Sequence, residues 1–324
     1  MIENQWILHF DHPAQFINRQ GEGTSPSDNN SLSPEESAPQ QNNGSNPFPV
    51  DWRIRIVTHL TKDVPAAYDG GPSHKAGALV VQSTPGKDAQ GRHMGFATPS
   101  PVGLALSLAI KASEQAAALR AAINESRSVS PFGPSTNVTL DTIAELYDYF
   151  EHCMTAVTFS FQALEAYCNE VILYKAPEQY ALKKKKNELL VHPTELERIA
   201  STDEKLAVVL PDLLGVETPG GGKLWRPYQE LKDLRDSTIH IKSHDFSPGV
   251  RKPEELNISS LFVRLLQADV MSWPKASVAL INYFDTDDVP RYWVDSVVKK
   301  LGIKPEKPKT TRSKQDRPSR GNRP

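Results

Sequence analysis

Four polar residues that could carry chemistry lie close together in one stretch of the chain: Arg235, Asp236, His240 and His244. An imidazole is suited to proton transfer, because its unperturbed pKa lies near neutrality. A guanidinium is permanently charged and presents a planar fork of donors, which suits it to hold an anion. The stretch could therefore combine proton transfer with the binding of a negatively charged group.

A helix is predicted to position these residues. Pro227 follows the glycine run 220–222 and fits the first position of a helix, where its missing N–H costs nothing. At about 100° per residue, Arg235 lies beside the inner stripe of this helix and His240 roughly 140° away from it. A site that uses both tips therefore needs either Arg235 reaching round on its long stem or a second copy of the chain. The inner stripe, which we expect to be buried, consists of Tyr228, Leu231, Leu234, Thr238 and Ile241.

Other interpretations of the same residues stay open. Asp236, His240 and His244 stand at i, i+4 and i+8, a stripe that could ligate a metal ion and support metal-dependent hydrolysis. The glutamate of the H-E-x-x-H zinc motif is missing from it, however. Arg235 and Asp236 could also join a solvated charge pattern, with His240 as an ordinary surface histidine.

The pattern of an arginine, four residues and a histidine, with a polar residue directly after the arginine, resembles the R-x4-6-H motif of the HEPN superfamily. Its members are small all-helical domains, many of them metal-independent RNases of toxin–antitoxin and antiviral systems. The resemblance covers about residues 140–284. Residues 160–172 (S-F-Q-A-L-E-A-Y-C-N-E-V-I) are similar to the first-helix pattern of such proteins, and residues 201–215 lie where their middle helices often lie.

The resemblance implies roles for the motif residues. His240 would act as general acid or base on the ribose 2′-OH or the leaving 5′-oxygen, and Arg235 would hold the scissile phosphate. Asp236 would orient His240, because side chains at i and i+4 meet on a helix. The motif helices of two protomers would face each other across a homodimer cleft. Cleavage of RNA would need no metal or cofactor and would leave a 2′,3′-cyclic phosphate.

The setting implied is a toxin–antitoxin or antiviral system, with an antitoxin or other regulatory partner. The alternative is a catalytically inactive HEPN-like module that binds RNA or a protein. Glu165 and Asn169, an i, i+4 pair on the long helix, could support the active site or form a polar edge of that helix. Four lysines could attract RNA phosphates or face solvent on a helix, namely Lys183, Lys184, Lys185 and Lys186.

Composition and charge favour a soluble cytoplasmic protein with no membrane partner. The chain has 324 residues and a formal net charge of −2, yet the stretch from Lys299 onward holds ten basic against two acidic residues. The start of the chain lacks the basic region of a signal peptide, and we expect no membrane span. Cys153 and Cys168 fall in one predicted helix roughly 22 Å apart, so they cannot bridge each other there, and a reducing compartment fits best.

The expected fold is mainly α, a HEPN-like bundle over about 140–285 preceded by a small α+β region. Strands are expected at 6–10, 51–61, 78–82 and 93–97, and none after residue 140. Helices are expected at 101–126, 140–174, from 177 through the four lysines, 206–214 after a capping box, from 227, 256–284 interrupted at Pro274, and 292–301. The predicted organisation is a short segment (1–18), a disordered linker (19–49), the α+β region (50–127), a linker (128–139), the helical domain (140–302) and a disordered basic tail (303–324).

Overall fold

The computed structural model of the protein describes residues 7–10, 51–65, 73–125, 128–129, 136–137, 142–184, 187–242, 260–285 and 293–310. The predicted linker 19–49, most of the predicted linker 128–139, Lys185, Lys186, His244 and the tail from residue 311 lie outside the described residues. The chain divides into two compact units, Met1–Thr98 and Pro99–Pro324.

The first unit is an antiparallel sheet organised around one long strand, β3 (Leu79–Lys87). Strands β1 (Ile7–Phe10) and β2 (Ile56–His59) pair with the first part of β3, and β4 (His93–Ala97) pairs with its second part. β3 continues beyond the predicted end at residue 82. Pro85 is tolerated because β3 pairs there with β4 alone, so the missing N–H can face away from the ladder.

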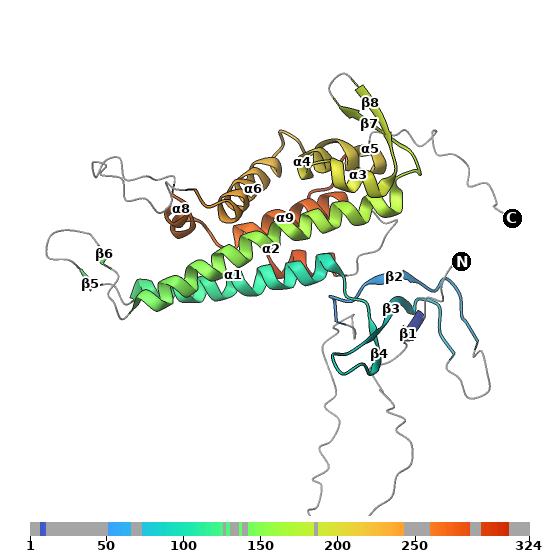
Figure 1. Ribbon diagram of the computed structural model, residues 1–324, viewed down its shortest axis with the longest axis horizontal. Helices are drawn as coiled ribbons and strands as arrows, with labels where there is room; N and C mark the ends of the chain where they lie inside the picture. Colours follow the sequence, from blue (N-terminus) through green and yellow to red (C-terminus); the bar gives the residue numbers. More distant parts are fainter. Residues whose placement is uncertain are drawn as a thin grey trace, which may run out of the picture. The chain divides into compact units, whose positions relative to one another are not determined.

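The second unit is built on two long helices, α1 (Pro101–Glu125) and α2 (Ile143–Lys175), which lie side by side (Figure 1). The inner face of α1 is rich in small residues, with Ala105, Ala109 and Ala116 buried, which lets the two helices approach closely. The assignment of this helix to the N-terminal α+β region is therefore wrong, because its apolar face is buried within the helical unit.

Within the described residues, one helical segment, Pro101–Ile123, is long and apolar enough to cross a membrane by length and composition. No such segment was expected from the sequence. Of its most apolar stretch, 56% is buried inside the protein, as in the core helix of a soluble protein.

Shorter helices cover the rest of α2, as Figure 1 shows. The capping box predicted at Ser201 is confirmed: its Oγ accepts from Glu204 N, and the Glu204 carboxylate accepts from Ser201 N. The bounds are α3 (Pro193–Ile199), α4 (Thr202–Glu204), the π-helix η2 (Lys205–Val209), α5 (Leu210–Leu214), α6 (Trp225–Ile239), α8 (Leu261–Gln267), α9 (Ser272–Phe284) and α10 (Val294–Lys300). The short strands β5 (Ser128–Val129) and β6 (Thr136–Asn137) pair within the predicted linker.

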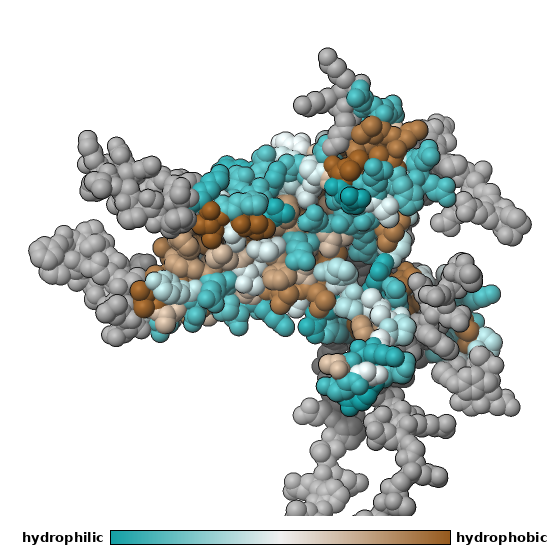
Figure 2. Space-filling model, viewed as in Figure 1, coloured by the Kyte–Doolittle hydropathy of each residue, from teal (hydrophilic) through white to brown (hydrophobic). Residues whose placement is uncertain are grey.

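A β-hairpin replaces the helix predicted from residue 177, so the expectation of no strand after residue 140 is wrong. Strands β7 (Tyr180–Lys184) and β8 (Asn187–Val191) pair antiparallel. Tyr180 and Leu182 are buried while Ala181 and Lys183 are exposed, the two-residue period of a strand. A hydrophobic patch lies on the hairpin below its hydrophilic tip (Figure 2), and Leu190 of β8 is 66% exposed.

Two helix boundaries that were predicted from prolines differ in the structure. Helix α6 begins at Trp225, so Pro227 is its third residue rather than its first. The stretch 256–284 contains two helices, but the break lies at residues 268–271, and Pro274 stands in the first turn of α9. Both prolines thus occupy a first turn, where backbone N–H groups have no partner within the helix.

Residues 303–310 do not form the disordered tail that was predicted for them. Glu217 N donates to Lys309 O at 3.0 Å, and Val216 forms an isolated β-bridge with Thr310. Lys307 Nζ also donates to Asn282 O at 3.3 Å and to Asp285 O at 3.1 Å. This part of the basic stretch is therefore attached to the helical unit.

Both cysteines should be unreactive in the folded protein. They are free and fully buried, and burial raises the pKa of Cys153 to about 11 and that of Cys168 to about 12. The thiolate is the nucleophile, so iodoacetamide at pH 8 should leave both thiols unmodified in the native state and label both in denaturant. Mass spectrometry of the alkylated protein checks this, and rapid labelling of either thiol without denaturant would contradict the buried positions.

Candidate functional site

Helix α6 positions the motif residues by packing one face into the helical unit. Tyr228, Leu231, Leu234 and Thr238 are buried, as the inner stripe predicted. Ile241, the fifth member of that stripe, is 47% exposed because α6 ends at Ile239. His240 follows as the C-cap, with φ −117° and ψ 64°, and its backbone N–H donates to Asp236 O at 2.9 Å.

A network of hydrogen bonds fixes the first half of α6. The Tyr228 hydroxyl and Lys232 Nζ both donate to the carboxylate of Asp203, which stands in α4. Burial and the bond to Asp203 hold the pKa of Tyr228 well above its usual range, so the phenol stays protonated. These contacts hold α6 against α4. They could not be predicted from residue spacing, because 25 residues separate Asp203 from Tyr228.

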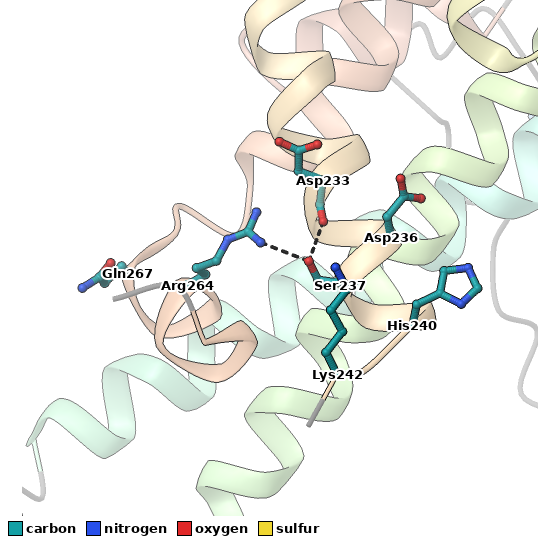
Figure 3. A pocket seen from close by; sticks show the side chains of 7 residues that line it. All are labelled: Asp233, Asp236, Ser237, His240, Lys242, Arg264 and Gln267. Atoms are coloured by element: carbon teal, nitrogen blue, oxygen red, sulfur yellow. Dashed lines mark hydrogen bonds between the residues drawn. The ribbon is translucent and has the colours of Figure 1, made fainter. Parts of the chain in front are cut away.

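An open groove of about 800 Å³ lies where α6 ends (Figure 3). Two segments far apart in the sequence form it: the end of α6 with the residues that follow, and helix α8. The residues that line it are all of polar type: Asp233, Asp236, Ser237, His240, Lys242, Arg264 and Gln267.

Two of the predicted catalytic residues line this groove, and the third does not. His240 and Asp236 belong to its lining, whereas Arg235 does not. The guanidinium of Arg235 lies over the ring of Phe161, with Cζ 4.2 Å from the ring centroid, and Nη1 donates to Asp236 Oδ1 at 2.8 Å. Its side chain is 26% exposed. Within one chain, Arg235 therefore turns toward α2 and does not reach round to His240.

The expected contact between Asp236 and His240 is not formed. The Asp236 carboxylate accepts from Arg235. His240 is exposed, and its imidazole makes no hydrogen bond to any residue that the structure describes. The reason is local, because the capping conformation takes His240 out of the helical geometry that brings i and i+4 side chains together.

Arg264 is one of the groove residues that the sequence did not indicate. Its Nη1 donates to Ser237 Oγ at 3.1 Å, and the Ser237 hydroxyl donates to Asp233 O at 2.8 Å (Figure 3). One signal was available, since Arg264 is the only charged residue in the segment L-F-V-R-L-L-Q of α8. No spacing relates it to the motif, because a long intervening stretch separates the two in sequence.

The part of the lysine run that the structure describes does not join this groove. Lys183 is exposed on β7, Lys184 ends that strand, and neither belongs to the groove lining. The hairpin and helix α8 lie toward opposite ends of α2 in Figure 1. The lysines that the structure describes therefore stand on a different part of the helical unit from His240.

Asn169 holds a buried lysine. Its Oδ1 accepts from Lys205 Nζ at 2.7 Å, and the same amine donates to Glu197 O at 2.8 Å. Lys205 is 1% exposed, so its ammonium depends on these two oxygens. Neither Asn169 nor Glu165 lines the groove. The structure thus gives Asn169 a part in packing between α2 and η2, outside the lining of the groove.

The described residues contain no group of three His, Cys, Asp or Glu side chains that could hold a metal ion. His244, the third member of the predicted metal stripe, lies outside the described residues.

Arg235→Ala should destabilise the folded protein whether or not Arg235 takes part in catalysis. It removes the cation over Phe161 and the stem that covers the ring, which should lower the free energy of unfolding by about 1–2 kcal/mol. Arg226→Ala, on the exposed start of the same helix, is the matched control and should change it by less than about 0.5 kcal/mol. Urea unfolding curves compare the two, and equal effects would argue against a packed Arg235.

Asn169→Ala should lower the free energy of unfolding by about 1–3 kcal/mol, because it leaves a buried ammonium without one acceptor. Adding Lys205→Met should recover part of that loss, since the unpaired charge is then gone. Thermal and urea unfolding of the single and double variants measure this. A single variant as stable as wild type would show that Asn169 does not hold Lys205.

Compared with protein-family models, with curated proteins and with solved structures, this chain gives no match.

Proposed function

We propose that the protein is a metal-independent endoribonuclease with a HEPN-like helical domain, acting at the groove around His240. The observation that carries this proposal is the position of His240, an exposed imidazole at the end of α6 in an open polar groove. Lys242 and Arg264 line the same groove, so cationic groups stand where an RNA phosphate would enter. The mainly helical character of the second unit supports this proposal.

The reaction needs one proton acceptor and one proton donor. With an exposed imidazole as general base, the ribose 2′-OH loses its proton and its oxygen attacks the phosphorus. The bond to the 5′-oxygen breaks, and this oxygen receives a proton from an acid. The products are a 2′,3′-cyclic phosphate and a 5′-hydroxyl end. No metal ion or cofactor enters this scheme.

A homodimer would complete the site, because Arg235 of the same chain faces Phe161 and not the groove. The surface beside His240 suits a protein contact. Ile239 is 50% exposed and Ile241 is 47% exposed, and Leu266, next to the groove residue Gln267, is 42% exposed. Apolar side chains of this size around a polar groove favour association with a second copy, which would place its motif helix opposite.

One observation favours the second candidate function, a catalytically inactive module that binds RNA or a protein. Arg235 is engaged by Phe161 and Asp236, and in the groove Asp233 and Asp236 offset the charges of Lys242 and Arg264. The proposed setting for either function is a cytoplasmic toxin–antitoxin or antiviral system with a regulatory partner.

His240→Ala should abolish RNA cleavage while leaving the fold intact, because the imidazole is exposed and makes no side-chain hydrogen bond to a described residue. Wild type and variant are incubated with total RNA or tRNA in EDTA, and the new ends are typed by their sensitivity to phosphatase and cyclic phosphodiesterase. We expect a loss of at least about 100-fold in rate, the usual contribution of a positioned acid or base. His93→Ala, an exposed histidine in the sheet unit, is the matched control.

The outcomes separate the alternatives. Cleavage by wild type in EDTA, with 2′,3′-cyclic ends and none from His240→Ala, supports the proposal. Cleavage that stops on chelation points to the metal-dependent hydrolase. RNA binding without cleavage, unchanged by His240→Ala, supports the inactive module.

A further inference from the structure

Arg264 is the arginine of this groove whose charge is available to a ligand. We infer that Arg264 binds a backbone phosphate of the RNA and holds the RNA strand across the groove, so that His240 can reach the strand. The inference rests on the proposed function and names a positioning residue that lies outside the motif. Two segments would then supply the site: the end of α6 carries the proton-transfer group, and α8 carries the residue that binds the phosphate.

The charge of Arg264 has only a neutral partner. Its Nη1 donates to the Ser237 hydroxyl, and no carboxylate among the described residues pairs with it. By contrast, Arg235 is paired with Asp236. Arg120 is used inside the fold, where Nη1 donates to Ala268 O at 2.6 Å and Cζ lies 5.7 Å from the centre of the Tyr149 ring. An arginine without an anionic partner at an open polar surface is suited to take a phosphate.

The surroundings of Arg264 hold its guanidinium in a defined direction. Helix α8 is anchored by buried Leu261 and Leu265, and Ser260 caps it by accepting from Val263 N. The Ser237 hydroxyl donates its hydrogen bond to Asp233 O, so its oxygen can accept from Arg264. Figure 3 shows Arg264 extending from α8 toward Ser237, with His240 on the other side of that serine. One N–H of five is used, which leaves others for a ligand.

The lining also indicates which part of the RNA is recognised. The seven lining residues are all polar and include no Phe, Tyr or Trp. Bases would therefore find no large aromatic side chain to stack on, so recognition should act mainly on the phosphate backbone and tolerate different sequences.

The test uses a single-stranded RNA with 2′-O-methyl groups, which can be bound and cannot be cleaved by attack of a 2′-OH. Its affinity for the full-length protein is measured by fluorescence anisotropy over a series of salt concentrations. Arg264→Gln removes the charge and keeps a donor for Ser237. We expect about a tenfold loss of affinity, equal for oligonucleotides of different sequence. The slope of log affinity against log salt should fall in magnitude by about 0.7, the value for one phosphate contact on a single strand.

Two further variants make the test specific. Arg226→Ala removes the same charge from the exposed start of α6 and should change neither the affinity nor the slope. Ser237→Ala keeps the charge of Arg264 and removes the hydroxyl that directs it. Its affinity should fall by less than that of Arg264→Gln, and its slope should equal that of wild type.

The results distinguish this inference from the proposed function. If wild type binds and cleaves RNA while Arg264→Gln keeps both its affinity and its salt slope, the inference is wrong and the nuclease proposal stands. An equal loss in Arg226→Ala would likewise overturn it, because the effect would then be one of net charge. If wild type neither binds the methylated RNA nor cleaves natural RNA, both fail together. On natural RNA, support requires that Arg264→Gln raises KM more than it lowers kcat.

Discussion

The ring of Phe161 is the contact on which the candidate site depends. It stands on α2, is almost completely buried, stacks on Tyr228 with ring centroids 6.3 Å apart, and carries the guanidinium of Arg235 on its face. Tyr228 and Arg235 lie two helical turns apart on α6, so this one ring fixes the helix along half its length. The position where α6 ends follows from that contact, and with it the position of His240.

The same contact limits what one chain can do. Arg235 stabilises the packing of α6 by lying over Phe161 and bonding to Asp236, and these partners hold it away from the groove. A side chain that stabilises a helix against its neighbour is not free to meet a substrate elsewhere on the same chain. The cationic side of the groove comes instead from Lys242 and Arg264, which lie on either side of the stretch 243–259 in sequence.

Sequence patterns predicted features that depend on neighbours along the chain. The three- and four-residue period placed Tyr228, Leu231 and Leu234 in the core, and the Ser201 capping box is local by nature. Features set by distant partners were missed. The run of four lysines favoured a helix, so the alternation of Tyr180 and Leu182 in β7 was missed. The small-residue face of α1 could be assigned to the helical unit only from its packing against α2.

The same distinction between local and distant partners applies to the residues of the candidate site. His240 and Asp236 were found because they belong to one motif, whereas the partner of Asp236 depends on a capping conformation that spacing cannot reveal. Arg264 reaches the groove only through the packing of α8, a tertiary arrangement with no trace in the spacing of the motif. Periodicity can therefore identify a helix and its buried face without identifying what stands opposite.

The β-bridge between Val216 and Thr310 joins the last described residues to the segment just before α6. Lys307 holds the same stretch to the end of α9 through Asn282 and Asp285. A chain shortened at residue 302 would lose these bonds, which leaves the N–H of Glu217 and the carbonyl groups of Asn282 and Asp285 without these partners. A label or fusion attached directly after Thr310 would start beside Val216.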